Sequence, residues 1–235
     1  MKKIIAMIPA RIGSKRVPKK NIRLIDGKPL IGYVIETIKK TTVFDEVYLN
    51  ADDLIFEKIA KDYGIKFYYR DKQFSSDEST NDEFALDFMK NVEGDILLQV
   101  LPTSPLISSK EIEEFTKYMI DNRLETLISV EHKQIACLYD NELLNFDKFK
   151  KNPPSQEMEP IKAYATVLMG WEYSSFKYNM KNFGCAYHGG SSKIGYYQLE
   201  GLATLDIDNE EDFLLAEAII MALKKQKKNE IKFYV

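Results

Sequence analysis

The sequence has few of the residues that build metal centres or covalent frameworks. Its 235 residues include two cysteines, Cys137 and Cys185, and two histidines, His132 and His188. The cysteines form no C-x-x-C pair and have no histidine cluster nearby, which argues against a zinc site and for a reducing compartment. No serine or cysteine nucleophile motif surrounds the histidines, so we interpret both as ordinary polar or packed residues.

Long apolar runs and an excess of basic charge are also missing. No run approaches the roughly 18 apolar residues that a membrane-spanning helix needs. The apolar run 4–10 weakly resembles the core of a signal peptide, but it is short and is followed directly by Arg11. The 33 basic and 36 acidic residues are interspersed and give a formal charge of −3, with no basic stripe. We therefore expect a cytoplasmic protein whose partners include neither a nucleic acid polymer nor a membrane.

Short β-type runs alternate with longer stretches of helical periodicity in the first half of the chain. The β-type runs cover residues 4–8, 47–50, 67–69, 96–101 and 126–130, and the helical stretches cover residues 31–38, 55–63, 84–92 and 112–120. This order predicts an α/β fold with a doubly wound, Rossmann-like, mostly parallel sheet and helices on both of its faces. Ligands should then bind at the carboxyl ends of the strands.

The second half departs from this rhythm. From about residue 135 the sequence becomes rich in aromatic and polar residues, with Pro153-Pro154 and Gly189-Gly190, before a helical stretch over residues 210–224. We expect a single domain, residues 1–235, in which residues from about 135 to 190 form a protruding arm. Exposed apolar arms generally need a partner surface, so we predict an oligomer, specifically a homodimer.

The strongest candidate site is segment 8–21, IPARIGSKRVPKKN, which begins where the first strand should end. Gly13 permits backbone geometry that other residues reach at a cost, so that successive amide groups can converge on phosphate oxygens. Arg11, Lys15 and Lys20 would neutralise a triphosphate. The spacing matches neither the P-loop nor the dinucleotide-binding pattern. A basic, solvated surface loop is the alternative, but the position after the first strand favours phosphate binding.

A second candidate site is the pair Asp206 and Asp208. On an extended segment this spacing puts both carboxylates on one face, with Ile207 turned the other way into the core. Such a pair, completed by triphosphate and water, suffices for one Mg²⁺. The alternative is helix capping, in which Asp208 and Glu211 form a capping box. Both interpretations hold if Asp206 ligates the metal while Asn209 caps the helix.

Gln99 is a third candidate, because it lies near the end of an expected strand and its amide can both donate to and accept from a base edge. The alternative is an ordinary capped strand end. Pro102 and Pro105 would then only stiffen a turn, and Ser104 or Ser108 would cap the next helix.

Five blocks together resemble the acylneuraminate cytidylyltransferase family, the enzymes that make CMP-sialic acid and related CMP-nonulosonates. Segment 9–21 is similar to the family's P-A-R-x-G-S-K-G-x-x-x-K-N, and NIR and DGKPLI in segment 21–31 continue it. SDEST at 76–80 lies where the family has a nucleoside-contacting loop. QVLPTSPL at 99–106 resembles Q-x-x-P-T-S-P-L, and LDIDNEEDF at 205–213 resembles the metal-binding D-I-D-x-x-x-D-F.

The resemblance implies a fold of the nucleotide-diphospho-sugar transferase type and transfer of CMP from CTP to an acidic sugar with release of pyrophosphate, for surface glycan biosynthesis. The acceptor oxygen would attack the α-phosphate in line. The catalytic residues would be Arg11, Lys15 and Lys20. Asp206 and Asp208 would bind Mg²⁺. The nucleotide would contact Ala10, Gly13, Ser14, Asn21, Ser79, Thr80 and Gln99, although residues such as Asn21, Ser79 and Thr80 also populate turns and caps. Family members are homodimers in which an arm reaches the neighbouring active site.

The sequence departs from the family on the sugar side. Arg16 replaces the second glycine of G-S-K-G, and Ser155 replaces an arginine expected before a Q-D-L-P-like stretch. The family's E-H-x-P-x-K reads EHKQIA at 131–136, so a basic residue that helps to hold the acceptor is displaced or absent.

The candidates for acceptor contacts are therefore Lys133, Lys162 and Tyr164, the last of which opens YATVLMGW in place of the family's Y-x-x-N-G-A-x-Y. The acceptor could be legionaminic, pseudaminic or sialic acid. The alternatives are a cytidylyltransferase for another acid, Kdo-like or not a sugar, and a non-catalytic homologue.

Overall fold

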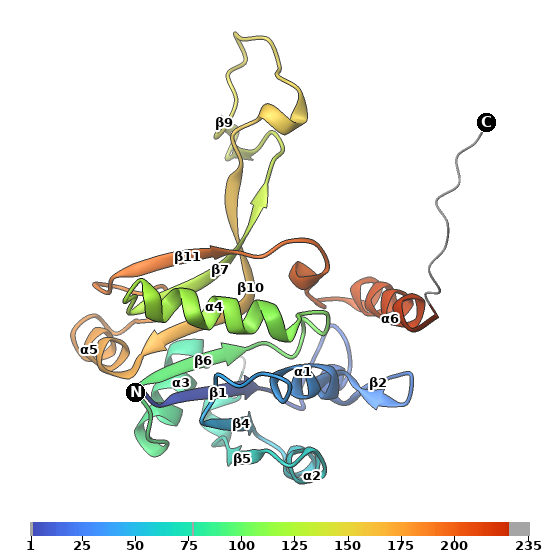
Figure 1. Cartoon of the computed structure of the whole chain (residues 1–235), viewed down its shortest axis with the longest axis vertical. Helices are drawn as coiled ribbons and strands as arrows, with labels where there is room; N and C mark the ends of the chain where they lie inside the picture. The colour runs from blue at the N-terminus through green and yellow to red at the C-terminus, as the bar shows by residue number, and fades with distance from the viewer. Residues whose placement is uncertain (1, 77, 226–235) are drawn as a thin grey trace.

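A seven-stranded sheet forms the centre of the protein (Figure 1). The computed structural model describes residues 2–76 and 78–225. Along the sheet the strands lie in the order β11 (Ile194–Gln198), β7 (Thr126–Lys133), β10 (Ile161–Glu172), β6 (Ile96–Val100), β1 (Ile4–Pro9), β4 (Glu46–Ala51) and β5 (Lys66–Tyr69). Among these strands only β10 runs antiparallel to its neighbours. The predicted α/β fold with a mostly parallel sheet is confirmed, and the antiparallel β10 is an addition to the prediction.

Helices cover both faces of this sheet. One face carries α1 (Leu30–Ile38), α2 (Leu54–Tyr63) and α4 (Ser109–Asp121), and the other carries α3 (Asn81–Asn91) and α5 (Tyr173–Phe183). The central strand β1 is apolar throughout because it is buried on both sides. Ile4, Ala6 and Ile8 pack in the layer between the sheet and α1, α2 and α4, which we call the first layer. Ile5 and Met7 pack in the layer between the sheet and α3 and α5.

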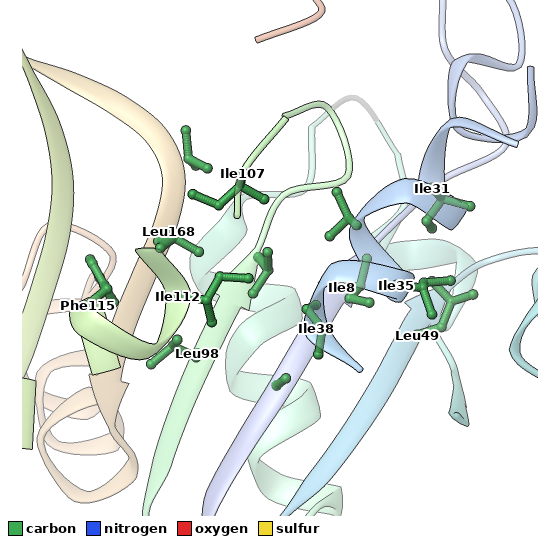
Figure 2. Packing of buried hydrophobic residues seen from close by; sticks show 14 of the residues in the cluster. Ile8, Ile31, Ile35, Ile38, Leu49, Leu98, Ile107, Ile112, Phe115 and Leu168 are labelled. Carbon is green, nitrogen blue, oxygen red and sulfur yellow. The ribbon is translucent and has the colours of Figure 1, made fainter. Parts of the chain in front are cut away.

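The first layer is closely packed, as Figure 2 shows, with α1 and α4 lying over β1, β4 and β6. Ile35 and Ile38 belong to the same cluster as Ile8, and Ile112 joins them from α4. These side chains recur at helical spacing in the sequence, so the apolar stripe that predicted each helix is also the surface that fixes it to the sheet.

Capping residues fix where the helices begin. Thr80 accepts from the Glu83 amide and Glu83 reaches back to the Thr80 amide, which forms a capping box at the start of α3. Ser108 and Glu111 form the same box on α4, so the prediction that Ser108 caps a helix is confirmed. These boxes satisfy amide groups that the helix itself leaves without partners.

The last helix, α6 (Glu210–Lys225), packs with a separate small apolar cluster. Val17 from the loop after β1, Ile25 from the small hairpin β2 (Leu24–Ile25) and β3 (Lys28–Pro29), and Ile207 meet Phe213 in this cluster. The loop after β1 and the segment before α6 are therefore held together by a shared core.

The strands β7 and β10 extend beyond the sheet and carry a projection (Figure 1). We call residues 131–163 the arm. Its end holds the hairpin β8 (Leu138–Tyr139) and β9 (Glu142–Leu143) and a 3₁₀ turn, Ser155–Glu157. Residues from Ala165 to 190 lie elsewhere, in the inner half of β10, in α5 and in the loop after it, so the projection is shorter than the range 135–190 predicted for it.

An irregularity in β10 lies near the carboxyl edge of the sheet. The register against β7 shifts between Tyr164 and Met169, and Thr166 has a φ of 52°. The Val167 carbonyl accepts from the Leu101 amide at 3.0 Å, so the bulge is held against the turn that follows β6. A β-branched residue is strained at positive φ, whereas asparagine tolerates that region.

Thr166→Asn should raise the free energy of unfolding by roughly 1 kcal/mol, because it relieves this strain without removing a packed side chain. Urea unfolding followed by circular dichroism measures the change. Thr42→Asn is the matched control, since Thr42 is not among the residues with positive φ. Equal or lower stability of Thr166→Asn than of the control would contradict the strain argument.

None of the helices in the described part of the chain combines the length and the apolar character needed to span a bilayer.

Candidate active site

A cavity of about 390 Å³ opens at the carboxyl ends of β1 and β6. The loop after β1, the first turn of α3 and the turn after β6 surround it. Its lining residues are Pro9, Ala10, Arg11, Ser14, Lys15, Arg16, Lys20, Asn21, Arg70, Asn81, Phe84, Leu101, Pro102, Thr103 and Asp208. Five of these side chains are cationic and one is a carboxylate, so the cavity attracts a polyanion and has a place for a cation beside it.

The loop after β1 is anchored at both of its ends. The Ala10 amide donates to the Asn50 carbonyl at 2.9 Å, and the Ile12 amide donates to Asp52 Oδ1 at 3.0 Å. Farther along, the buried Asn21 side chain donates to the Arg11 carbonyl at 3.3 Å. These contacts come from β4 and from the loop itself, and they hold the cationic side chains of the loop at the cavity wall.

Gly13 does not play the conformational part predicted for it. It is exposed, does not line the cavity, and is not among the residues with positive φ, and a Cβ added to it would meet nothing within 4 Å. The left-handed residue of this loop is Lys19, with a φ of 53°. Nothing in this conformation of the loop therefore requires glycine at position 13.

Asp206 and Asp208 lie on an extended segment that faces the loop. Ile207 between them is buried, and its amide donates to the Thr103 carbonyl at 3.0 Å, so the prediction that Ile207 turns into the core is confirmed. Asp206 Oδ1 is buried without a hydrogen-bond partner, and burial raises the pKa of this carboxyl above its usual value. A buried carboxylate oxygen without a partner is the donor that a hard divalent cation takes, so the pair fits Mg²⁺.

The capping alternative is resolved by the next residues. Asn209 Oδ1 accepts from the Asp212 amide at 3.0 Å, and Asp212 accepts from the Asp208 and Asn209 amides. Asn209 and Asp212 thus form the cap, and the predicted Asp208–Glu211 box is wrong. The cap thus uses the Asn209 and Asp212 side chains and not those of Asp206 and Asp208.

Only these two carboxylates form the candidate cation site. The described residues contain no group of three or more His, Cys, Asp or Glu side chains that could hold a metal ion. The remaining ligands would therefore have to come from a bound triphosphate and from water.

Lys20 lies between the loop and this pair. Its ammonium group donates to the Ile207 carbonyl. Burial lowers the pKa of Lys20, while the nearby carboxylates of Asp206 and Asp208 act in the opposite direction. The predicted catalytic residues Arg11, Lys15 and Lys20 thus all line one cavity with Asp208.

Of the residues predicted to contact the nucleotide, Ala10, Ser14 and Asn21 line the cavity. Ser79 and Thr80 do not, and Thr80 caps α3. The first turn of that helix contributes Asn81 and Phe84 to the lining, and neither was predicted.

Gln99 is fully buried in β6, between Met7 of β1 and Met169 of β10 in register, and does not line the cavity. Neither its amide nitrogen nor its amide oxygen has a hydrogen-bond partner. Replacing a buried, unpaired amide by a side chain of similar size removes a desolvation penalty.

Gln99→Met should therefore raise the free energy of unfolding by about 1–3 kcal/mol. Urea unfolding of the nucleotide-free protein measures it. Gln198→Met on the exposed surface of β11 is the control and should change the value by less than about 0.5 kcal/mol. Loss of stability in Gln99→Met would show that the amide does find a partner.

Arg70 is a further residue of the cavity lining that the sequence did not predict. It follows β5 directly, lines the cavity and is buried, with its guanidinium 4.3 Å from the centre of the Phe84 ring. It donates to Asn50 Oδ1 at 2.9 Å and to the Asn50 carbonyl at 2.7 Å. Burial lowers its pKa to about 10, so it remains a cation at neutral pH. Its position directly after a predicted strand was the signal that could have found it.

The residues predicted to contact the acceptor lie at the base of the arm, outside the cavity lining. Lys133 forms an ion pair with Glu131 at 2.6 Å, and Lys162 is exposed opposite His132. Tyr164 lies 5.5 Å from His188 between ring centres. The described chain therefore brings the residues of the loop after β1 and Asp208 together in one cavity but leaves these three apart from them.

A cationic cavity at the carboxyl edge of a doubly wound sheet, with two aspartates beside it, is the arrangement of a nucleotide-binding α/β protein. The chain belongs to the family described as Cytidylyltransferase, which it matches over residues 5–230. The resemblance predicted from the five sequence blocks is thereby confirmed.

The relatives agree with this assignment. The chain is 32% identical to an N-acylneuraminate cytidylyltransferase of Escherichia coli O18:K1:H7 over 98% of its own length and 54% of that protein. It is 32% identical to a pseudaminic acid cytidylyltransferase of Campylobacter jejuni, over 69% of its own length and 74% of that protein. The chain thus spans about half the length of the first of these curated relatives.

Solved structures show the same fold at low identity. A CMP:2-keto-3-deoxy-manno-octonic acid synthetase complexed with CTP superposes with a TM-score of 0.72 at 18% identity, covering 94% of this chain and 99% of that one. A 4-diphosphocytidyl-2C-methyl-D-erythritol synthase from Anaerococcus prevotii gives 0.67 at 12% identity, with the same coverage.

Proposed function

We propose that this protein transfers CMP from CTP to an acidic sugar, a nonulosonic acid such as legionaminic, pseudaminic or sialic acid, and releases pyrophosphate. The observation that carries the proposal is the single cavity in which Arg11, Lys15 and Lys20 face Asp208. A triphosphate with four negative charges fits such a lining, and the sugar named in the relatives' activities supports the acceptor class.

The side chains of this cavity would act by position and charge. Arg11 and Lys15 would bind the β- and γ-phosphates and stabilise the charge that grows on pyrophosphate as it leaves. Lys20, held by the Ile207 carbonyl, would place its ammonium beside the α-phosphate. Asp206 and Asp208 would hold Mg²⁺, which when bound polarises the α-phosphate and lowers the pKa of the attacking hydroxyl.

The side chains that α3 contributes to the cavity lining would select the nucleotide base. Asn81 offers an amide that both donates and accepts, and Phe84 offers a ring face, as a pyrimidine base requires. The ribose would lie near Asn21, which is buried and has an Oδ1 without a hydrogen-bond partner. An unpaired buried acceptor next to a cavity is satisfied by a donor such as a ribose hydroxyl.

The acceptor site would be completed by a second copy of the chain. The arm exposes large apolar side chains, among them Tyr139 at 74% and Phe149 at 86% exposure. Such a surface is usually covered, and a homodimer would bring Lys133 and Lys162 of one arm, with Tyr164 next to it, toward the partner's cavity. Sedimentation as a monomer at all concentrations would contradict this part of the proposal.

Pyrophosphate release in the presence of Mg²⁺ tests the function. CTP, UTP, ATP and GTP are each combined with nonulosonic acids and with Kdo, and every positive reaction is examined by mass spectrometry. We expect release only with CTP and a nonulosonic acid, with a product of the mass of the CMP conjugate. Binding of CTP without turnover of any nonulosonic acid would reject this acceptor class.

A second candidate is a cytidylyltransferase for another acid, and one contact favours it. Lys133 is neutralised by Glu131 at 2.6 Å, so a cation proposed for the acceptor carboxylate already has a partner. A CMP conjugate of a different acid in the same mass spectra would select this candidate.

A further inference from the structure

An ion pair links two residues that line the candidate active site. Arg16 Nη2 lies 2.7 Å from Asp208 Oδ1, and both residues line the cavity. The pair joins the loop after β1 to the segment before α6, two parts of the chain that lie 192 residues apart. The side chains are 67% and 51% exposed, so neither is locked by packing.

This contact engages an oxygen that the cation site needs. A carboxylate oxygen that accepts from a guanidinium has one lone pair engaged by that donor, and the positive charge of the guanidinium opposes a divalent cation at the same carboxylate. The neighbouring Asp206 Oδ1 is buried without a hydrogen-bond partner. In the nucleotide-free protein, Asp206 Oδ1 therefore has no hydrogen-bond partner, while Asp208 Oδ1 is bound to Arg16.

We propose that Arg16 is a resident counter-ion of Asp208 that makes divalent-cation binding depend on the nucleotide. The inference rests on the proposed function, since it takes Asp208 as a metal ligand and the cavity as a triphosphate site. Without nucleotide, Arg16 competes with the cation for Asp208. With a triphosphate in the cavity, the planar guanidinium has phosphate oxygens to bind instead, and it changes partner without leaving the site.

The exposure of the pair makes this exchange easy. An exposed ion pair is weak, so Arg16 lowers the cation affinity of the free protein only a few-fold, yet it also offers a charge-assisted hydrogen bond to the triphosphate. Arg16 thus acts as a positioning residue that favours binding of the nucleotide and the cation together.

Titration of the nucleotide-free protein with Mn²⁺, followed by electron paramagnetic resonance, tests the proposal directly. Arg16→Gln should bind Mn²⁺ about fivefold more tightly than the unaltered protein. Arg16→Lys keeps the charge and should remain close to the unaltered protein. The matched control is Arg23→Gln, which removes the same charge from a neighbouring exposed pair with Glu210, at 2.6 Å, outside the cavity lining.

Calorimetry with CTP gives the second readout, and Arg16→Gln should bind CTP about tenfold more weakly. Equal Mn²⁺ affinities of Arg16→Gln and Arg23→Gln would overturn the proposal, as would the absence of Mn²⁺ binding to Arg16→Gln. The proposal would also be overturned if Arg16→Gln still tightened Mn²⁺ binding in a protein that carries Asp208→Asn as well, because the effect would then not depend on Asp208. The Mn²⁺ titration contains neither CTP nor an acceptor, so its outcome is distinguishable from failure of the proposed transferase activity.

Discussion

Asparagine in place of Asp208 should lower the rate of pyrophosphate release from CTP by about 100- to 1,000-fold. The substitution keeps the size of the side chain but replaces one carboxylate oxygen of the candidate cation site by an amide nitrogen, which does not bind a hard cation. Asp208 is exposed, and the cap of α6 is made by Asn209 and Asp212, so the fold should be retained. Initial rates at saturating CTP and Mg²⁺ measure the effect.

Glu210→Gln is the matched control for this experiment. Glu210 belongs to the same acidic segment and pairs with Arg23 at 2.6 Å, but it does not line the cavity. We expect its rate to stay within about threefold of the unaltered protein, because exposed pairs contribute little. A comparable loss in both variants would point to the overall charge of the segment rather than to a cation at Asp208.

Arg70→Met should weaken CTP binding by about 10- to 100-fold. Arg70 is the buried cation of the cavity wall, so solvent screens its charge less than it screens the charge of an exposed cation. Methionine fills a similar space and relieves the cost of burying a cation, but it leaves Asn50 Oδ1 without the Arg70 donor, while the Asn50 carbonyl keeps the Ala10 amide. These opposing effects on stability keep the change in folding small.

Calorimetric titration with CTP measures the loss, and two further variants interpret it. Arg70→Lys retains the charge without the planar fork and should fall between the unaltered protein and Arg70→Met. Lys66→Met removes a cation from the start of β5, the strand that Arg70 follows. Lys66 does not line the cavity, so this variant should bind CTP with unchanged affinity. Unchanged CTP affinity in Arg70→Met would assign Arg70 a purely structural part.

The parallel half of the fold could be predicted from the sequence because local pattern and tertiary environment agree there. The run IIAMIP of β1 is apolar at every position, as a strand covered on both faces must be. The helix stripes that include Ile35 and Ile112 recur at helical spacing, and each packs on the sheet as that spacing requires. The alternation of Asp206, Ile207 and Asp208 likewise follows from extended backbone alone.

The remainder depends on long-range pairing that no local pattern encodes. β10 lies between β6 and β7 although it follows both in the sequence, and its register changes at the strained Thr166. Arg70 was missed for a related reason, since a single arginine after a short strand belongs to no motif. Its burial at the cavity wall arises only when β5, β4 and α3 are assembled. The conformational part assigned to Gly13 was wrong because the positive φ falls on Lys19 instead.

The place of β10 in the sheet has a consequence for the order in which the chain folds. Until residues 161–172 have been synthesised, β6 has β1 on one side and an open edge on the other, and β7 has no neighbour between itself and β6. A nascent chain that stops short of β10 therefore presents an unpaired apolar strand edge, which is the surface on which aggregation begins. Insertion of β10 closes that edge, joins the two halves of the sheet and holds the turn after β6 through the bond between the Leu101 amide and the Val167 carbonyl. The cavity is then completed by the later segment that carries Asp208.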